Sequence, residues 1–251
     1  MRRLLVCALL LGSALGGCTS GSDDAASGTS APPATMTTEA APPSSSATPG
    51  TGCPATASGR PTGVPSTADS KPTLDVDGDG RPDTDWIDDE TVVGGGFPFG
   101  VSTASGGDFY ENFASASPVE RSVLVADVTG KGEFIALASD GRAVQLWAIS
   151  KCSLVPVLNA QGQQYTFDLG FTGFGTGVGC ADIDGDGVRN LVGLQVDGTS
   201  ITSTAIDLDG RTATNGTSRT IADAGPALVD AASQVTCGDL TMAANGVRAP
   251  R

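Results

Sequence analysis

The feature that most constrains this chain is an Asp-rich hexapeptide that recurs at a nearly constant interval. Asp-Val-Asp-Gly-Asp-Gly at 75–80 returns as Asp-Ile-Asp-Gly-Asp-Gly at 182–187, and Asp-Val-Thr-Gly-Lys-Gly at 127–132 is a degenerate copy. A fragment in the same phase, Cys-Gly-Asp-Leu-Thr, stands at 237–241. Successive loop aspartates are 52, 55 and 57 residues apart. A period of this length indicates repeated supersecondary units that pack on one another.

Within each unit the sequence predicts four short β-strands and no helix of useful length. In the second and third units the strand-like stretches are residues 122–128, 133–139, 143–150, 164–169, 179–183, 190–195, 200–206 and 219–222. Asp-Gly pairs at 140–141 and 197–198 mark hairpin turns between the middle strands. Four antiparallel strands per unit are typical of β-propeller blades. We therefore expect an all-β, propeller-like array of three complete repeats and a partial fourth.

The third unit resembles a known repeat family. Phe-Gly-Thr-Gly-Val-Gly at 174–179 runs almost directly into the Asp-rich sequence at 182–187. This is similar to the FG-GAP or VCBS repeat, found in the head propeller of integrin α-subunits and in many bacterial surface proteins. The resemblance covers about residues 73–240 and implies propeller blades. Most such propellers have seven blades, too many for this chain, so a small closed ring, an open arc and completion by oligomerisation stay open.

Both complete loops have the oxygen spacing of a calcium site, without the bidentate glutamate that ends a helix-flanked loop. The side chains at positions 1, 3, 5 and 9 are Asp75, Asp77, Asp79 and Asp83 in one loop, and Asp182, Asp184, Asp186 and Asn190 in the other. The carbonyls of Arg81 and Val188 would serve position 7. Converging carboxylates repel one another without a cation, which favours two Ca²⁺ sites over ion-free Asx turns. The loop at 127–132 has Lys131 in place of a carboxylate, so we expect it to be metal-free.

The first residues predict export and lipid attachment. After two arginines comes an uncharged, mostly apolar run at 4–17, shorter than the roughly 20 residues that cross a bilayer. It ends in Leu-Gly-Gly-Cys at 15–18, which resembles the bacterial lipobox. We expect a signal peptide at 1–17, a lipidated Cys18, and a location on the outer face of the plasma membrane of a bacterial envelope, with the lipid as the only membrane contact. An ordinary cleaved signal is the alternative.

Composition separates a stalk from a folded domain and narrows the partners. Residues 18–70, rich in Ser, Thr, Pro and Ala, predict a disordered stalk, and residues 71–251 predict the repeat domain. The formal net charge is −14, and loss of the two arginines of the signal peptide brings it to −16. So acidic a chain repels nucleic acid. It has no histidine, which excludes His-based triads and makes a zinc site very unfavourable.

Four cysteines remain after the signal peptide and Cys18, and an even number in an exported protein predicts two disulfides. Cys180 and Cys237 each stand two residues before a loop aspartate, which places them at equivalent positions of neighbouring units. We therefore pair Cys180 with Cys237. Cys53 is left to pair with Cys152, which would pin the end of the stalk to the second unit.

No motif in the sequence indicates catalysis. There is no Gly-x-Ser-x-Gly elbow, P-loop or Ser-x-x-Lys pair. The large aromatic residues are expected in the core between units: Trp86, Trp147, Phe97, Phe99, Phe171 and Phe174. The leading expectation is a non-catalytic binding or adhesion module for a protein or glycan. A carbohydrate-active or other hydrolytic enzyme and an accessory subunit of an envelope complex are the alternatives.

Overall fold

The computed structural model describes residues 52–55, 63–89 and 96–250, so the expected signal peptide, Cys18 and most of the stalk lie outside the described residues. The described residues belong to one compact unit, Ala47–Arg251. That unit is all-β with one short helix, α1 (Pro226–Ala231), as the sequence analysis predicts. Within the described part of the chain, no helix has the length and apolar character to cross a bilayer.

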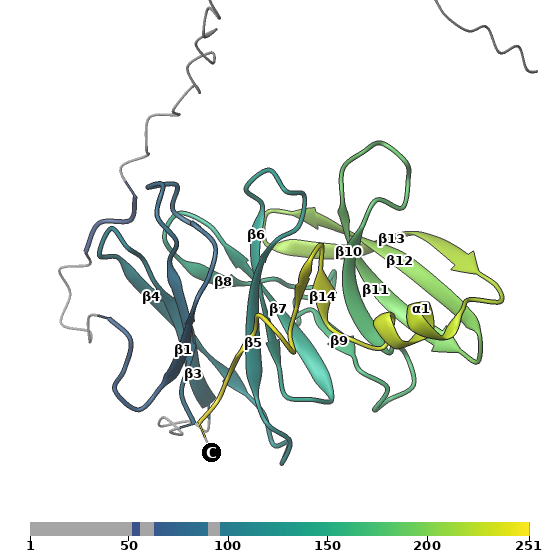
Figure 1. Cartoon of the computed structure of the whole chain (residues 1–251), viewed down its shortest axis with the longest axis horizontal. Coiled ribbons are helices and arrows are strands. Elements are labelled where there is room, and N and C mark those ends of the chain that lie inside the picture. The colour runs from purple at the N-terminus through teal and green to yellow at the C-terminus, as the bar shows by residue number, and fades with distance from the viewer. Residues whose placement is uncertain (1–51, 56–62, 90–95, 251) are drawn as a thin grey trace, which may run out of the picture. The chain divides into compact units, whose positions relative to one another are not determined.

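Three antiparallel sheets follow one another along the chain (Figure 1). The first sheet has the strand order β1 (Asp69–Pro72), β2 (Thr84–Ile87), β3 (Gly96–Ser102), β4 (Asp108–Ala114). The second has the order β16 (Val247–Arg248), β5 (Ser122–Asp127), β6 (Phe134–Ser139), β7 (Ala143–Ile149), β8 (Leu154–Pro156), and β9 (Thr166–Asp168) also pairs with β7. The third has the order β10 (Gly177–Ala181), β11 (Asn190–Asp197), β12 (Ser200–Asp209), β13 (Thr212–Ile221). A short hairpin of β14 (Thr236–Cys237) and β15 (Leu240–Thr241) follows.

The predicted strands are largely present, with two differences in their bounds. The last strand of the third unit begins at Thr212, earlier than expected, because a turn at Gly210 (φ 60°) joins β12 and β13 into one long hairpin. In the second unit, the single strand expected at 164–169 is accompanied by β8, and both β8 and β9 pair with different parts of β7. The loop between β8 and β9 therefore turns back on the sheet, which hydrophobic alternation alone does not encode.

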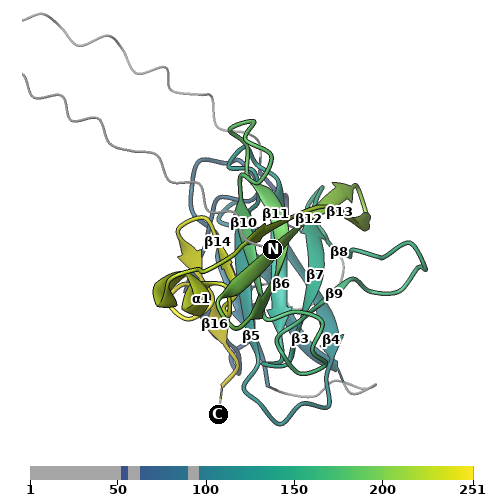
Figure 2. The same cartoon turned by 90° about the vertical axis from the view of Figure 1, so that its right-hand side faces the viewer.

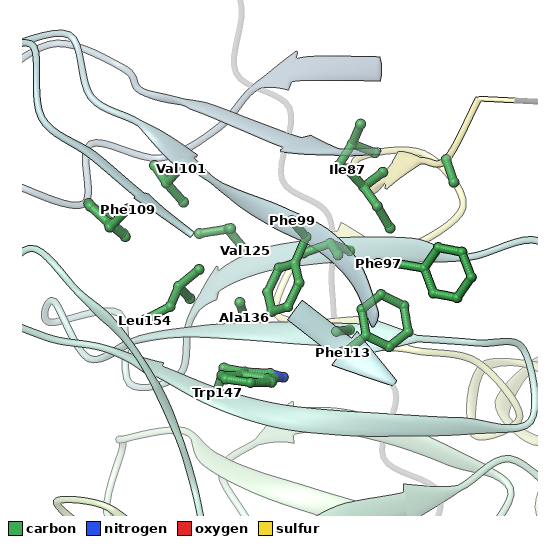
Figure 3. Packing of buried hydrophobic residues seen from close by; sticks show 14 of the residues in the cluster. Ile87, Phe97, Phe99, Val101, Phe109, Phe113, Val125, Ala136, Trp147 and Leu154 are labelled. Atoms are coloured by element: carbon green, nitrogen blue, oxygen red, sulfur yellow. The ribbon is translucent and has the colours of Figure 1, made fainter. Parts of the chain in front are cut away.

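The second sheet lies between two hydrophobic cores. Along β5 the side chains alternate: Val123 and Val125 belong to the core shared with the first sheet, and Leu124 and Ala126 to the core shared with the third. In the first core, the Phe99 ring packs edge-on against Phe113 and Trp147, with centroids 5.7 and 5.3 Å away (Figure 3). Burial of both faces explains why β5 is a continuous apolar run.

The chain after α1 runs back past β10 and β5 (Figure 2), and β16 also contacts β1; we call residues 235–249 the C-terminal segment. A parallel bridge joins Val235 to Val178 of β10. Further on, β16 pairs antiparallel with β5. Lys71 of β1 donates hydrogen bonds to the carbonyls of Ala244 and Gly246, at 3.2 and 2.8 Å. The partial fourth repeat thus lies as an extended segment against β10, β5 and β1 and does not form a further four-stranded sheet.

Two disulfides cross-link these layers. Cys53 is bonded to Cys152, 99 residues away, and Cys180 is bonded to Cys237, 57 residues away. The second is the pair that the repeat positions predict, and the first is the pair that this prediction leaves. The first links the chain before β1 to the turn between β7 and β8, and the second links β10 to β14. The first bond therefore ties the chain before the repeats to the second repeat, and the second bond joins two neighbouring repeats.

Candidate functional site

The three Asp-rich loops share one backbone frame. In each loop the carboxylate of the first aspartate (Asp75, Asp127 or Asp182) accepts hydrogen bonds from the N–H groups three and five residues later, at 2.7–3.0 Å. Both donors in each loop are glycines with φ between 73° and 92°, a region that other residues enter only with strain. Because the degenerate loop has the same frame, this frame follows from Asp and Gly alone. The remaining carboxylates decide whether a loop suits a cation.

In the first loop the structure brings together three of the four predicted carboxylates. Oxygen atoms of Asp75, Asp77 and Asp83 all lie within 4.8 Å of one another. Asp79 is directed elsewhere: its Oδ2 accepts hydrogen bonds from Nη2 and Nε of Arg81, at 2.6 and 3.0 Å. Oxygen ligands at this separation fit a hard cation such as Ca²⁺.

Asp83 is the buried member of this group, with 1 % of its surface exposed. Burial raises the pKa of its carboxyl; hydrogen bonds from the N–H groups of Ala104 and Val76 oppose the rise, and the charges of Asp77 and Asp75 add to it. The carboxyl is thus desolvated beside two like charges. A bound cation would stabilise its ionised form, so the donor set fits a divalent metal.

The second loop is more open. Oxygens of Asp182, Asp184 and Asp186 lie within 4.8 Å of one another, and all three residues are exposed. Asn190 follows at the ninth position, and its Oδ1 accepts a long hydrogen bond from the N–H of Ile183 (3.4 Å). Hydrogen bonds, above all that from the N–H of Gly185, lower the pKa of Asp182 despite some desolvation. The second cluster thus uses the carboxylate at the fifth position, where the first cluster uses the one at the ninth, and solvent screens its charges more strongly.

The degenerate loop obtains a positive charge from a neighbouring repeat. Its third and fifth positions are Thr129 and Lys131, so it lacks the converging carboxylates. Arg189, at the eighth position of the next Asp-rich loop, donates hydrogen bonds to the carbonyls of Asp127 (3.0 Å) and Val128 (3.1 Å). This contact could not be predicted from the sequence, because only the packing of the second and third sheets brings together residues 61 and 62 positions apart.

The first disulfide is joined to the first loop. The backbone N–H of Cys53 contacts both Oδ2 of Asp77 (2.7 Å) and Oγ of Ser105 (2.8 Å), and the Ser105 hydroxyl lies near Oδ2 of Asp77 as well. Burial raises the pKa of Asp77, but hydrogen bonds from Ser105, Cys53 and Asp79 outweigh it and lower that pKa overall. The loop carboxylate is therefore held ionised by a residue of the cross-link.

A separate cleft of about 440 Å³ opens between the second and third sheets. Its walls combine aromatic residues with hydroxyl and amide groups: Tyr165, Phe167, Phe174, Thr166, Thr202, Thr204, Gln195 and Asn215. A neighbouring cleft of about 390 Å³ shares Tyr165, Thr166 and Asn215 with it and adds the polar residues Asn159, Gln161 and Thr214. We call the two together the intersheet cleft.

One expectation from the sequence is wrong in the loop after β9, in which Phe174 lines the intersheet cleft and Phe171 does not. Phe171 and Phe174, assigned to the core from the sequence, are 64 % and 86 % exposed. Their loop is held by Asp168, whose carboxylate accepts hydrogen bonds from the N–H groups of Thr172 and Phe174 at 3.0 and 2.9 Å. The Arg142 guanidinium lies 4.5 Å from the Phe171 ring centroid. Trp86, Trp147, Phe97 and Phe99 are buried as expected. Phe171 and Phe174 lie in a loop, where no alternation of apolar and polar residues distinguishes a buried position from an exposed one.

One buried acid stands apart from both features. Burial raises the pKa of Asp85 to about 7, and its Oδ1 has no hydrogen-bond partner among the described residues. An unpaired carboxyl in a cavity would favour hydrolytic chemistry. Asp85 is not among the residues that line the intersheet cleft. It therefore gives no support to catalysis there.

Fold and loops together define an all-β, disulfide-bonded protein with two Asp clusters that fit possible calcium sites. Searches against protein-family models, curated proteins and solved structures found no match for the chain. The resemblance to FG-GAP or VCBS repeats thus rests on the residues at 174–187 and on their recurrence along the chain.

Proposed function

We propose that this chain is a calcium-stabilised, lipid-anchored protein of the bacterial cell surface that acts as a non-catalytic binding module for a protein or glycan. In this proposal its repeats are FG-GAP or VCBS blades in a propeller-like array. The observation that carries the binding role is the intersheet cleft, whose lining includes hydroxyl and amide groups and the exposed ring of Phe174. Exposed aromatic residues beside a concave polar surface are typical of recognition sites.

The calcium part of the proposal rests on the buried carboxyl of Asp83. Its pKa is raised by burial and by Asp77 and Asp75, so calcium would stabilise the native state by relieving this repulsion. In the second loop the ligands would be Asp182, Asp184, Asp186 and Asn190. The role assigned to calcium is structural, since neither loop lines the intersheet cleft.

The extracytoplasmic location is supported by the disulfides and by the first eighteen residues. Disulfides persist in oxidising compartments, and this domain carries two. The charge-free run that ends at Cys18 has the length and ending of a lipoprotein signal. The chain between Cys18 and the disulfide-bonded Cys53 would act as the stalk that holds the cleft away from the membrane.

A second candidate, an accessory subunit of an envelope complex, is favoured by an apolar groove of about 430 Å³ between α1 and the third sheet. Its apolar lining includes Ile183, Val192, Leu194, Ile201, Ile221 and Leu228. Ile221 and Leu228 are 48 % and 47 % exposed. A partner subunit would cover such a surface.

Membrane fractionation of the native protein and Cys18→Ala tests the anchored location. We expect the native protein in the membrane fraction, and the variant either released or retained as the longer uncleaved precursor. Identical fractionation and migration would contradict the lipoprotein assignment. The non-catalytic role is tested separately, by incubating the native protein with polysaccharides and peptides and analysing them by mass spectrometry. Cleaved products would favour the hydrolase instead.

A further inference from the structure

We propose that the intersheet cleft binds an uncharged oligosaccharide, with a sugar ring stacked on Phe174 and its hydroxyls bonded to the amides and hydroxyls of β11, β12 and β13. This inference rests on the proposed function and names the ligand of that binding module. It is carried by the charge, the hydrogen-bonding capacity and the rim of the cleft.

The lining combines polar and apolar groups and is almost uncharged. The chain has 14 basic and 28 acidic residues, yet Asp168 is the one charged residue among the described residues that line the cleft. Its carboxylate already accepts hydrogen bonds from two backbone N–H groups of the rim loop. An anionic ligand would meet no cation here, and a basic peptide would meet one occupied carboxylate. The lining therefore selects a neutral ligand that needs many hydrogen bonds.

The groups that could make those bonds lie on adjacent strands. The Thr202 hydroxyl lies 3.1 Å from that of Thr220, and the Thr204 hydroxyl lies 2.8 Å from that of Ser218, which makes a ladder of hydroxyls across β12 and β13. A hydroxyl both donates and accepts, so each rung can add bonds to a ligand. Rows of paired hydroxyls suit the alternating donors and acceptors of a sugar.

Two side-chain amides extend this surface. Tyr165 donates its hydroxyl hydrogen to Oδ1 of Asn215 at 2.6 Å, which fixes the amide, while Nδ2 has no partner within the described part of the chain. Gln195, exposed on β11, likewise has no side-chain hydrogen bond to any described residue. Burial raises the pKa of Tyr165 to about 12, so its hydroxyl stays protonated in the physiological range. Amides and phenol together offer donors and acceptors without net charge.

The rim supplies the apolar contact. A pyranose ring presents a face of C–H groups, and such a face packs on an aromatic ring. Phe174 is 86 % exposed and lines the cleft, and its backbone is fixed by Asp168. The two parts of the cleft, about 440 and 390 Å³, fall within the range of about 300–1,000 Å³ usual for ligand sites. They suit a short segment of a glycan chain.

The test compares neutral oligosaccharides with uronic acid oligosaccharides of equal length on a glycan array, followed by calorimetry of the strongest neutral binder. We expect binding to a neutral member that changes little between low and high salt. Phe174→Ala should weaken it at least about tenfold, and Phe174→Tyr should restore most of it. Gln195→Ala should weaken it several-fold. The control, Leu228→Ala, removes a partly exposed apolar side chain outside the cleft and should leave affinity unchanged.

Three outcomes would overturn the inference: no binding to either panel, preferential binding to the acidic panel, or neutral binding that Phe174→Ala leaves unchanged. The proposed binding module would still stand if the protein bound a peptide with an affinity sensitive to Phe174. Release of cleaved sugars from the array would instead contradict the non-catalytic role while retaining the ligand class. The two proposals therefore fail separately.

Discussion

The backbone N–H of Cys53 donates a 2.7 Å hydrogen bond to Oδ2 of Asp77, so the residue cross-linked to Cys152 of the second sheet also holds a carboxylate of the first Asp-rich loop. Ser105 bonds to both partners and closes the network. The Cys53–Cys152 cross-link and the candidate calcium site of the first loop are therefore parts of one hydrogen-bonded network. Removal of the disulfide should therefore alter calcium binding at the first loop.

The double variant Cys53→Ser/Cys152→Ser should weaken calcium binding at the first loop about tenfold, because residues that orient a metal ligand commonly contribute 10- to 100-fold to affinity. Calorimetric titration with calcium measures this loss of affinity at the first loop. The control Cys180→Ser/Cys237→Ser removes a disulfide with no contact to Asp77, and should lower stability without changing the first site. Equal affinities of the native protein and the Cys53/Cys152 variant at that site would contradict the coupling.

Calcium should raise the melting temperature through the two complete loops and not through the degenerate one. With dissociation constants of about 0.1–1 mM, roughly 2 mM calcium stabilises by about 0.6–1.8 kcal/mol per site, a shift of several degrees in a domain of this size. Asp77→Asn keeps an acceptor for Cys53 but removes a charge, and should abolish about half of the shift. Asp184→Asn should do the same.

The matched control for these variants is Thr129→Asn, at the third position of the degenerate loop, which should leave the calcium-dependent shift unchanged. Magnesium should substitute poorly, because it requires a tighter octahedron. All variants are compared by melting curves in chelator and in calcium. Equal melting temperatures of the native protein in both buffers would contradict the calcium proposal and leave the loops as Asx turns.

Phe99 and Phe174 should behave in opposite ways when truncated. Phe99 is fully buried against Phe113 and Trp147, so Phe99→Ala should cost about 3–5 kcal/mol of unfolding free energy. Phe174 is 86 % exposed, and Phe174→Ala should change stability by no more than about 0.5 kcal/mol. Denaturant unfolding measures both. A loss of several kcal/mol in Phe174→Ala would instead indicate that Phe174 is buried, as first expected from the sequence.

The turn residue Asp140 should make stability fall in acid. Burial tends to raise its pKa, but hydrogen bonds from Ser115, Arg142 and Ala143 outweigh this and lower it. A lowered native pKa means stabilisation that is present above the unfolded value of about 3.9 and is lost as pH falls through the native value. Asp140→Asn should thus melt about 2–4 °C below the native protein at pH 7, for a loss of about 1 kcal/mol. The gap should shrink towards pH 3; a constant gap would contradict the charge-dependent part.

The sequence predicted what is local. The loop frame follows from Asp at position 1 and glycines at positions 4 and 6, and the turns follow from Asp140-Gly141 and Asp197-Gly198, since only glycine adopts these conformations readily. The equivalent positions of Cys180 and Cys237 predicted their disulfide, because repeats place matching residues side by side. Strand β5 was recognisable because a strand buried on both faces is apolar throughout.

What depends on the packing of one repeat against another was not predictable in the same way. Arg189 reaches the carbonyls of Asp127 and Val128 only because of how two sheets meet. Phe174 faces solvent because Asp168 fixes its loop outward, which no periodicity encodes. Asp79 lies outside the carboxylate cluster because its side chain forms an ion pair with Arg81, two residues away.

The pairing of the C-terminal segment with β5 has a consequence for how the domain folds during synthesis. In the second sheet β5 pairs with β6 on one side and with β16 on the other, where Val247 lies opposite Val123. The residues of β16 are synthesised more than a hundred positions after β5, so during synthesis the β5 edge is left without its native partner. Open edges of apolar strands recruit other chains. A nascent or truncated chain that stops before Val247 should therefore need a chaperone, and removal of β16 should make the folded domain prone to aggregation.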